Sequence, residues 1–233
     1  MKKPNFQVIY EDNHLIAVNK PAGMLVQGDE TGDKPLMDYV KEYIKVRYDK
    51  PGDVFLGVVH RIDRPVSGAV IFARTTKSLE RMNKIFADRE VDKTYWALVK
   101  DRPDPLNATL IHYLDKDRER NITKALDAPS RRHPDAKKSE LTYDLISSIG
   151  NYHLLEVHPK TGRSHQIRAQ LSRVGLPIKG DLKYGYPTPD KDGNISLHCR
   201  AMKFMHPVTK LEVEVVADPP KDQVWDQFAR TLV

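Results

Sequence analysis

One carboxylate stands out in the sequence because of the residues around it. Asp63 lies between two arginines, Arg61 and Arg64, and shortly before an apolar run that begins at Ala69. Burial alone would raise the pKa of a carboxyl group, whereas a neighbouring guanidinium favours the ionised form. An ionised carboxylate that water solvates poorly is a capable nucleophile. The alternative is a solvated turn, in which Asp63 and Ser67 bond backbone groups and the arginines face outward.

A second polar segment, residues 158–168, combines basic side chains with a turn at Gly162. Ser164 is placed to cap a helix that would carry Ile167, Leu171 and Val174 on its inner side. The start of such a helix offers backbone N–H groups and the positive end of its dipole to an anion. The side chains beside it that could bond phosphate groups or base edges are those of Arg163, His165 and Gln166.

Arg168 falls one turn further into this helix, beside its apolar side, where an arginine normally requires a carboxylate partner. The segment also has a plainer interpretation, as a basic amphipathic helix whose arginines all reach solvent. The aromatic run 93–99 leaves two interpretations open as well. Tyr95 belongs either to a core strand or to a platform on which a base stacks, and Trp96 is expected in the core.

Other kinds of site find little support. A metal site could be assembled only from scattered residues, without zinc-type spacing, so we expect none; these residues are His60, Asp63, His158, His165 and His198. Ser67 lacks the Gly-x-Ser-x-Gly context of a serine hydrolase, and no phosphate-binding Gly-x-x-x-x-Gly-Lys-Ser/Thr loop is present. The single cysteine, Cys199, excludes an internal disulfide and any multi-cysteine metal or iron–sulfur site.

The pattern of the whole chain predicts the elements that would position these segments. Residues 115–138 are polar, mixed in charge and without a sustained period, so we expect hairpins or loops there. Many strands with few helices favour an α+β fold on a largely antiparallel sheet. We expect strands at residues 8–10, 15–18, 69–73, 93–99, 141–145, 152–157, 196–204 and 211–216, and helices at 36–47, after Thr75 or Thr76, and after Ser164.

Composition sets the remaining limits. The 233 residues suffice for a full hydrophobic core. No apolar run approaches the length of a membrane span, and the first residues lack the apolar core of a signal peptide, so we expect a soluble cytoplasmic protein. The net charge of +6 permits a polyanionic partner. Residues 158–185 hold much of the excess, with six basic residues against one acid, Asp181.

Taken together, these motifs resemble those of the RluA family of pseudouridine synthases. Their order and spacing agree from about Val8 to Ala217, and the His-Arg-x-Asp and Gly-Arg-x-His-Gln motifs together are far more specific than either alone. The resemblance rests on residues 18–23, 60–63, 67–68, 93–99, 161–168, 175–181, 184–185, 197–198 and 204–207.

The resemblance implies a role for each of the main site residues. Asp63 matches the catalytic aspartate of the family, Tyr95 its active-site tyrosine, and Arg168 the basic residue that pairs with the aspartate. Arg61 matches the arginine thought to fill the gap that an extruded uridine leaves in the RNA stack. The predicted RNA-binding set comprises His60, Arg61, Arg64, Arg163, His165 and Gln166.

The resemblance also implies a fold and partners. The expected fold is a mixed, mainly antiparallel sheet flanked by helices and loops around a central basic catalytic cleft. Because the catalytic pattern starts within about ten residues of Met1, we expect a single catalytic domain, 1–233, without the N-terminal S4 domain of many relatives. The expected substrate is a flipped uridine in structured rRNA or tRNA. The isomerisation exchanges no atoms overall, so we expect no cofactor, and a monomer.

Two positions depart from the family pattern. Val66 replaces the usual threonine, and Gln170 stands where histidine is common, which puts local hydrogen bonding or RNA choice in doubt. Two rival functions remain. A glycoside hydrolase would need a pair of carboxylates, whereas each main motif here surrounds the single carboxylate of Asp63 with basic residues. A non-catalytic RNA-binding protein would not need Asp63, Tyr95 and Arg168 together.

Overall fold

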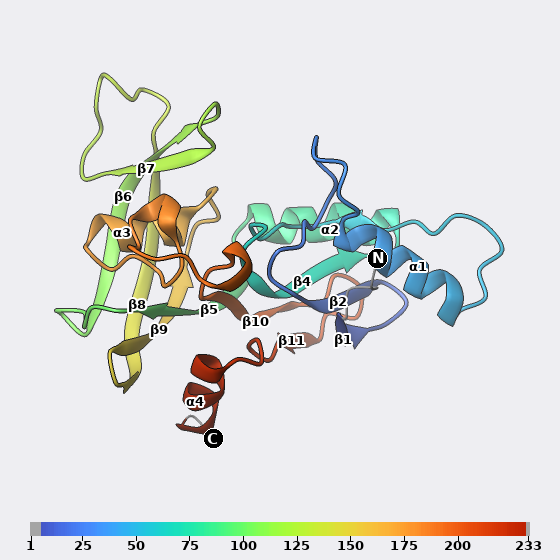
Figure 1. Ribbon diagram of the computed structural model, residues 1–233. Coiled ribbons are helices and arrows are strands. Elements are labelled where there is room, and N and C mark those ends of the chain that lie inside the picture. Colours follow the sequence, from blue (N-terminus) through green and yellow to red (C-terminus); the bar gives the residue numbers. More distant parts are fainter. Residues whose placement is uncertain (1–5, 232–233) are drawn as a thin grey trace. The chain divides into compact units, whose positions relative to one another are not determined.

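The computed structural model describes residues 6–231, which divide into two compact units (Figure 1). Unit one comprises residues 6–92 and 199–220, and unit two comprises residues 93–198 and 221–231. Within this range, no helix combines the length and the apolar character needed to cross a membrane. The expectation of one catalytic domain over residues 1–233 stays a prediction.

Unit one combines β-strands with two helices, and its strand pairs β1–β2, β2–β4, β3–β4 and β10–β11 are antiparallel. Its strands follow the order β1-β2-β4-β10, with β3 beside β4 and β11 beside β10. Helix α2 packs against β3 and β4. The elements are β1 (Gln7–Glu11), β2 (Leu15–Lys20), α1 (Leu36–Arg47), β3 (Gly57–Val58), β4 (Ser67–Ala73), α2 (Thr76–Ala87), β10 (Leu197–Met205), whose first two residues belong to unit two, and β11 (Glu212–Val216).

The predicted elements of unit one are confirmed, and their local causes are visible. Strand β4 is buried along its whole length, as its uninterrupted apolar run predicts. Helix α2 begins at Thr76 because the Thr75 hydroxyl oxygen accepts a hydrogen bond from the Ser78 N–H at 3.1 Å. Helix α1 ends one turn before Pro51–Gly52 and buries Leu36, Val40 and Ile44.

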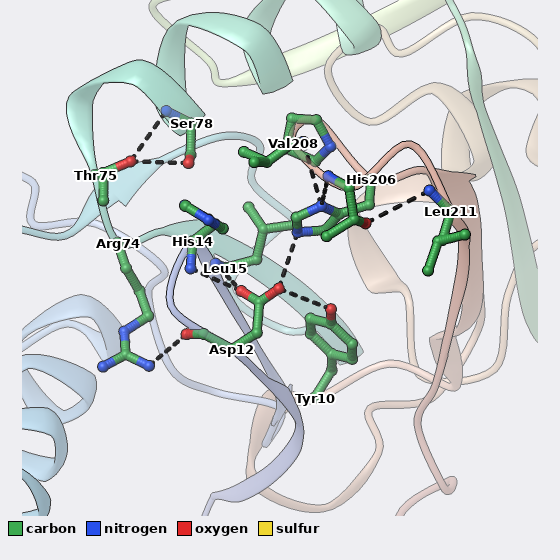
Figure 2. A network of polar contacts seen from close by, with 12 residues as sticks. Tyr10, Asp12, His14, Leu15, Arg74, Thr75, Ser78, His206, Val208 and Leu211 are labelled. Carbon is green, nitrogen blue, oxygen red and sulfur yellow. Dashed lines mark hydrogen bonds and ion pairs between the residues drawn. The ribbon is translucent and has the colours of Figure 1, made fainter.

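The turn between β1 and β2 is built on Asp12 (Figure 2). Its Oδ1 accepts hydrogen bonds from the N–H groups of His14 and Leu15, both at 2.7 Å. Burial raises the pKa of Asp12, but these two donors, the Tyr10 hydroxyl and His206 together lower it more, so the pKa of this carboxyl lies below its ordinary value. The Tyr10 hydroxyl donates to Oδ2 at 3.0 Å, and burial with this bond raises the pKa of Tyr10 to about 12.

His206 connects this turn to the loop between β10 and β11 (Figure 2). Its side chain is fully buried, and its Nε2 lies 2.9 Å from Oδ2 of Asp12. Its Nδ1 accepts the backbone N–H groups of Val208 and Thr209 at 3.2 and 3.0 Å. Since Nδ1 accepts, the ring proton lies on Nε2, which faces Asp12 at close range without the alignment of a hydrogen bond. One imidazole therefore joins two turns that lie almost 200 residues apart in the sequence.

The strands of unit two pair antiparallel with one another in the order β5-β9-β8-β6-β7. Helix α3 contacts β6 and β7, and α4 contacts β8. The elements are β5 (Val91–Val99), whose first two residues belong to unit one, β6 (Asn107–Asp117), β7 (Ile122–Leu126), β8 (Lys137–Ile149), β9 (Tyr152–Pro159), α3 (Gln166–Arg173), two short 3₁₀ turns η1 (Leu182–Tyr184) and η2 (Lys191–Gly193), and α4 (Gln223–Thr231).

Three features of unit two differ from the sequence predictions. The sequence analysis missed β6 and α4, although Trp225 and Phe228 sit at helical spacing and bury against Trp96 and Leu98. The excursion after residue 115 does form hairpins and loops, as predicted. The third difference is the start of α3, where Ser164 is exposed and is not the cap.

His165 takes the cap position of α3, in a left-handed conformation with φ of 51°. The reason lies in the turn before it, where the Gln166 N–H donates to the Arg163 carbonyl oxygen at 3.1 Å. This turn makes Gln166 the first helical residue, one position later than a cap at Ser164 would allow. The helix is also shorter than predicted. It ends at Arg173, and Val174 is 40% exposed instead of lying on the inner side.

Gly68, at the start of β4, allows a close approach between two strands of unit one. Its φ is +117°, and a Cβ there would lie 2.3 Å from the carbonyl oxygen of Cys199. Gly68→Ala is therefore expected to destabilise the protein by about 3 kcal/mol or more. Urea unfolding measures the change, with Gly52→Ala as control, because a Cβ at Gly52 meets nothing within 4 Å. Equal stability of the two variants would contradict this account.

Candidate functional site

The loop that carries Asp63 is hydrogen-bonded to the turn that follows β2. Asp63 is half-buried, and its carbonyl oxygen accepts the Val66 N–H at 3.0 Å. The carbonyl oxygen of the next residue, Arg64, accepts the Gly23 N–H at 2.8 Å and lies 3.2 Å from Nζ of Lys20. The backbone on both sides of Asp63 is thus fixed by hydrogen bonds within unit one.

Lys20 is the residue of this loop system that sequence reasoning did not single out. Its side chain is fully buried, and Nζ also donates to the carbonyl oxygens of Met24 at 2.7 Å and Pro21 at 3.1 Å. Burial lowers the pKa of Lys20 to about 7; the charge of Asp63 raises it and that of Arg64 lowers it further. Its signal in the sequence was its place two residues after Val18, on the same side of the strand as that buried residue.

Three predicted RNA-binding residues flank Asp63 and have different surroundings. His60 is half-buried; its Nε2 accepts the Ile71 N–H at 3.0 Å, and its ring stacks on Phe86 with centroids 4.9 Å apart. Arg61 is exposed. Arg64 is exposed as well, but its guanidinium bonds the Gly23 carbonyl at 3.0 Å and pairs with Asp33 at 2.7 Å.

In unit two, Arg168 has the carboxylate partner that its buried position requires. It projects from α3 and is 5% exposed, and its guanidinium bonds Asp181, which is 1% exposed. The pair is bidentate, with Nε to Oδ2 at 2.7 Å and Nη2 to Oδ1 at 2.9 Å. The guanidinium also lies over the ring of Tyr184, 4.9 Å from its centroid. The sequence contained Asp181 as the one acid of a basic segment, but spacing alone did not pair it with Arg168.

The predicted pairing of Arg168 with Asp63 joins residues of different units and stays a prediction. The bidentate contact with Asp181 uses Nε and Nη2, and a guanidinium carries five N–H donors in all. Asp181 holds the guanidinium of Arg168 in one orientation, whichever other acceptor the guanidinium contacts.

The other predicted residues of this segment divide between interior and surface. Arg163 is exposed. Gln166 is buried, and its side chain bonds the Thr161 hydroxyl at 2.8 Å, the Arg163 N–H at 3.1 Å and the Glu140 carbonyl at 3.0 Å. Its amide thus shapes the loop from inside, and its predicted contact with RNA stays a prediction. His165 is half-buried, with Nδ1 at 2.8 Å from the hydroxyl oxygen of Tyr184.

Tyr95 lies in β5 and is half-buried, opposite Val157 of β9. Trp96 points to the other face of the strand, as alternation requires, and joins a core cluster with Leu98 and Phe228. Its indole N–H donates to Glu156 at 3.2 Å. The core position predicted for Trp96 is confirmed, whereas the platform predicted for Tyr95 stays a prediction.

The two departures from the family pattern are both interior positions. Val66 is 2% exposed. Gln170 is fully buried, and its Nε2 donates to the Leu110 carbonyl and to Nδ1 of His112, both at 3.1 Å. Burial lowers the pKa of His112, which suits a neutral ring that accepts this bond. Gln170 thus acts on the packing of α3 against β6.

Among residues 6–231, no group of three or more His, Cys, Asp and Glu side chains is placed to hold a metal ion.

Comparison with known protein families assigns the chain. Residues 14–173, which include Asp63, Tyr95 and Arg168, match the family model described as RNA pseudouridylate synthase. The chain belongs to this family. The predicted resemblance to the RluA enzymes is therefore confirmed, and the protein is an isomerase that acts on uridine in RNA.

Curated relatives of this pseudouridylate synthase carry related names. The tRNA pseudouridine synthase C of Vibrio vulnificus is 34% identical over 237 residues, which cover 95% of this chain and 93% of the relative. The ribosomal large subunit pseudouridine synthase C of Buchnera aphidicola is 32% identical and covers 97% of this chain and 70% of the relative.

Solved structures agree with the fold. A human protein titled RNA Pseudouridylate Synthase Domain Containing 4 matches with a TM-score of 0.77 and 23% identity, over 95% of this chain and 91% of that chain. A second human protein, titled RNA Pseudouridylate Synthase Domain Containing 1, matches with a TM-score of 0.74 and 20% identity, over 100% and 96%. The predicted α+β fold on a mixed, mainly antiparallel sheet is confirmed.

Lys20 of the synthase is expected to give a pH-dependent stability. Its pKa is about 7 in the folded protein and near 10.5 in the unfolded chain. Between these values the unfolded state binds more protons, so the contribution of Lys20 becomes more favourable as pH rises, by about 1.4 kcal/mol per pH unit. Urea unfolding of wild type and Lys20→Met from pH 7.5 to 9.5 measures the difference. Lys45→Met, at an exposed site, is the control; a flat difference for Lys20 would contradict the prediction.

The Arg168–Asp181 pair is expected to be costly to break from one side. Asp181→Ala leaves a buried guanidinium without its carboxylate and should destabilise the synthase by about 3–5 kcal/mol. Arg168→Met combined with Asp181→Leu should restore much of the loss, because no buried charge remains. Urea unfolding measures both. Asp127→Ala, which breaks the exposed pair with Arg173, should change little; an equal loss there would contradict the assignment.

Proposed function

We propose that this synthase converts uridine in tRNA or large-subunit rRNA to pseudouridine, with Asp63 as its catalytic carboxylate. The observation that carries the proposal is the fixed backbone around Asp63, inside the part of the chain that matches the family. Hydrogen bonds hold the residues on both sides, and the half-buried side chain lies close enough to Lys20 for its charge to raise the pKa of that lysine. Such a carboxylate is positioned and only partly solvated, as nucleophilic or electrostatic catalysis requires.

The reaction moves one bond and exchanges no atoms overall. The bond from N1 of uracil to C1′ of ribose breaks, the base turns, and a bond from C5 to C1′ forms. C5 loses a proton and N1 ends with one, so the balance needs no oxidant, reductant or cofactor. Asp63 assists departure of the base at C1′ or at the neighbouring 2′ position, and Tyr95 stacks on the base or accepts the C5 proton.

The basic residues serve access and charge in this proposal. The target uridine leaves the stack at a cost of a few kcal/mol. Arg61, which is exposed, fills the gap, and Arg64, Arg163, His60, His165 and Gln166 contribute to binding or shaping the RNA site. Arg168, oriented by Asp181, keeps Asp63 ionised when the two groups meet.

Three further expectations belong to the same proposal. The enzyme acts as a single catalytic domain and as a monomer. It binds structured RNA and takes the target uridine in a flipped state. Its place is the cytoplasm, where tRNA and rRNA are available in bacteria.

Asp63→Asn is expected to retain RNA binding and to lower pseudouridine formation by at least about 1,000-fold, because the amide cannot act as an anionic nucleophile or base. Tritium release from C5-labelled uridine, in tRNA and in large-subunit rRNA transcripts, measures turnover, and filter binding measures affinity. Asp53→Asn, at an exposed site in the same unit, should be unaffected. Appreciable turnover by Asp63→Asn would overturn the role of Asp63, and the RNA that reacts identifies the substrate class.

A further inference from the structure

Tyr184 stands at the centre of the segment that carries the basic motif of unit two. It is the last residue of η1 and is 7% exposed. Its ring meets the His165 ring edge-on, with centroids 5.7 Å apart, and the Arg168 guanidinium lies over its face. One aromatic side chain therefore contacts two residues that the proposed function assigns to the site.

The hydroxyl group of Tyr184 has a defined set of partners. Its oxygen accepts the backbone N–H of Thr123 at 2.8 Å and lies 2.8 Å from Nδ1 of His165. With the oxygen accepting from the backbone N–H of Thr123, the hydroxyl proton is available for donation to Nδ1. Nδ1 is then the acceptor, and the imidazole carries its proton on Nε2. This tautomer is assigned from the donors and acceptors around the ring.

The backbone at His165 needs such support. Its φ of 51° is in the left-handed region, which non-glycine residues adopt only where the surroundings hold them. The carbonyl oxygen before it, of Ser164, accepts the Thr123 hydroxyl at 3.0 Å. Its own carbonyl oxygen accepts the Ala169 N–H at 2.9 Å. Thr123 and Tyr184 thus fix both the main chain and the ring of the motif.

We propose that Tyr184 is a positioning residue of the synthase, whose hydroxyl holds His165 with Nδ1 as acceptor and Nε2 as the donor for an RNA phosphate or base edge. The proposal deepens the proposed function and rests on it, because His165 is there an RNA-binding residue. Burial raises the pKa of Tyr184, so the hydroxyl keeps the proton that this arrangement needs. His165 in turn acts as a fixed donor instead of a ring that samples both tautomers.

Tyr184→Phe separates the hydroxyl from the ring. The variant keeps the contacts of the aromatic face with Arg168 and His165 and removes only the bonds to Thr123 and to Nδ1. Tyr186→Phe is the matched control: Tyr186 is also buried, lies two residues away, and has its hydroxyl beside Tyr152. Both changes remove one buried hydroxyl, so a general loss of packing would affect both alike.

The first experiment reads the tautomer directly. Nitrogen-15 NMR of the histidine-labelled full chain, with His165→Gln to identify the signal, should show Nδ1 unprotonated and Nε2 protonated in the wild type. Tyr184→Phe should move His165 toward a mixture of tautomers, and Tyr186→Phe should leave it unchanged. Protonated Nδ1 in the wild type, or an unchanged signal in Tyr184→Phe, overturns the proposal. The wild-type spectrum alone is decisive if the variant does not fold.

The second experiment reads the effect on RNA. Tyr184→Phe should raise KM for the substrate RNA by about 10-fold and change kcat by less than about 3-fold, because it weakens a binding contact and leaves Asp63 intact. In a His165→Ala background the same change should have no further effect on KM. Equal KM increases from Tyr184→Phe and Tyr186→Phe, or an undiminished effect without His165, overturn the proposal. Failure of the wild type to form pseudouridine would instead refute the proposed function, while the NMR result still tests the Tyr184–His165 bond.

Discussion

The buried ion pair of Arg168 and Asp181 is the constraint on which much of unit two depends. Removing both charges from water is expensive, and only close, bidentate geometry with further partners compensates for it. The structure supplies that geometry, and the Tyr184 ring covers the guanidinium. Because Arg168 comes from α3 and Asp181 from the turn before η1, the pair fixes these elements against each other, and the adjacent motif residues inherit a defined position.

Unit one deals with its buried charge differently. Lys20 has three carbonyl oxygens around Nζ, and the negative charge of Asp63 favours its protonated form. Dipoles stabilise an ammonium less than a carboxylate at contact distance does, so its pKa falls far, whereas the paired arginine remains charged. Each unit therefore contains a buried cation of a different kind: the charge of Lys20 depends on pH near neutrality, and that of Arg168 does not.

Local sequence patterns predicted most of the strands and helices. The uninterrupted apolar run of β4 and the Thr75 cap of α2 each predicted an element at its observed place. Ser164 failed as a cap because a hydrogen bond between Gln166 and Arg163 decides where α3 begins, and no propensity encodes that turn. The site residues divide in the same way, into those that local patterns predict and those that depend on contacts in the folded chain. Asp63 and Arg168 were recognised from motif and residue type, whereas Asp181 and Tyr184 gained their roles from contacts across 13 and 19 residues of chain, which spacing alone does not reveal.

Because unit one is made of two separate stretches of sequence, it cannot finish folding until late in synthesis. Strands β10 and β11 complete unit one, yet they follow the whole sheet of unit two in the sequence. The close contacts of Gly68 with Cys199 and of Asp12 with His206 therefore cannot form until more than 100 further residues have left the ribosome. During that interval the edge of β4 that later pairs with β10 lacks this partner. An unpaired strand edge can pair with the wrong segment. The loop that holds Asp63 lies beside this strand, so the proposed catalytic carboxylate reaches its final setting among the last parts of the fold.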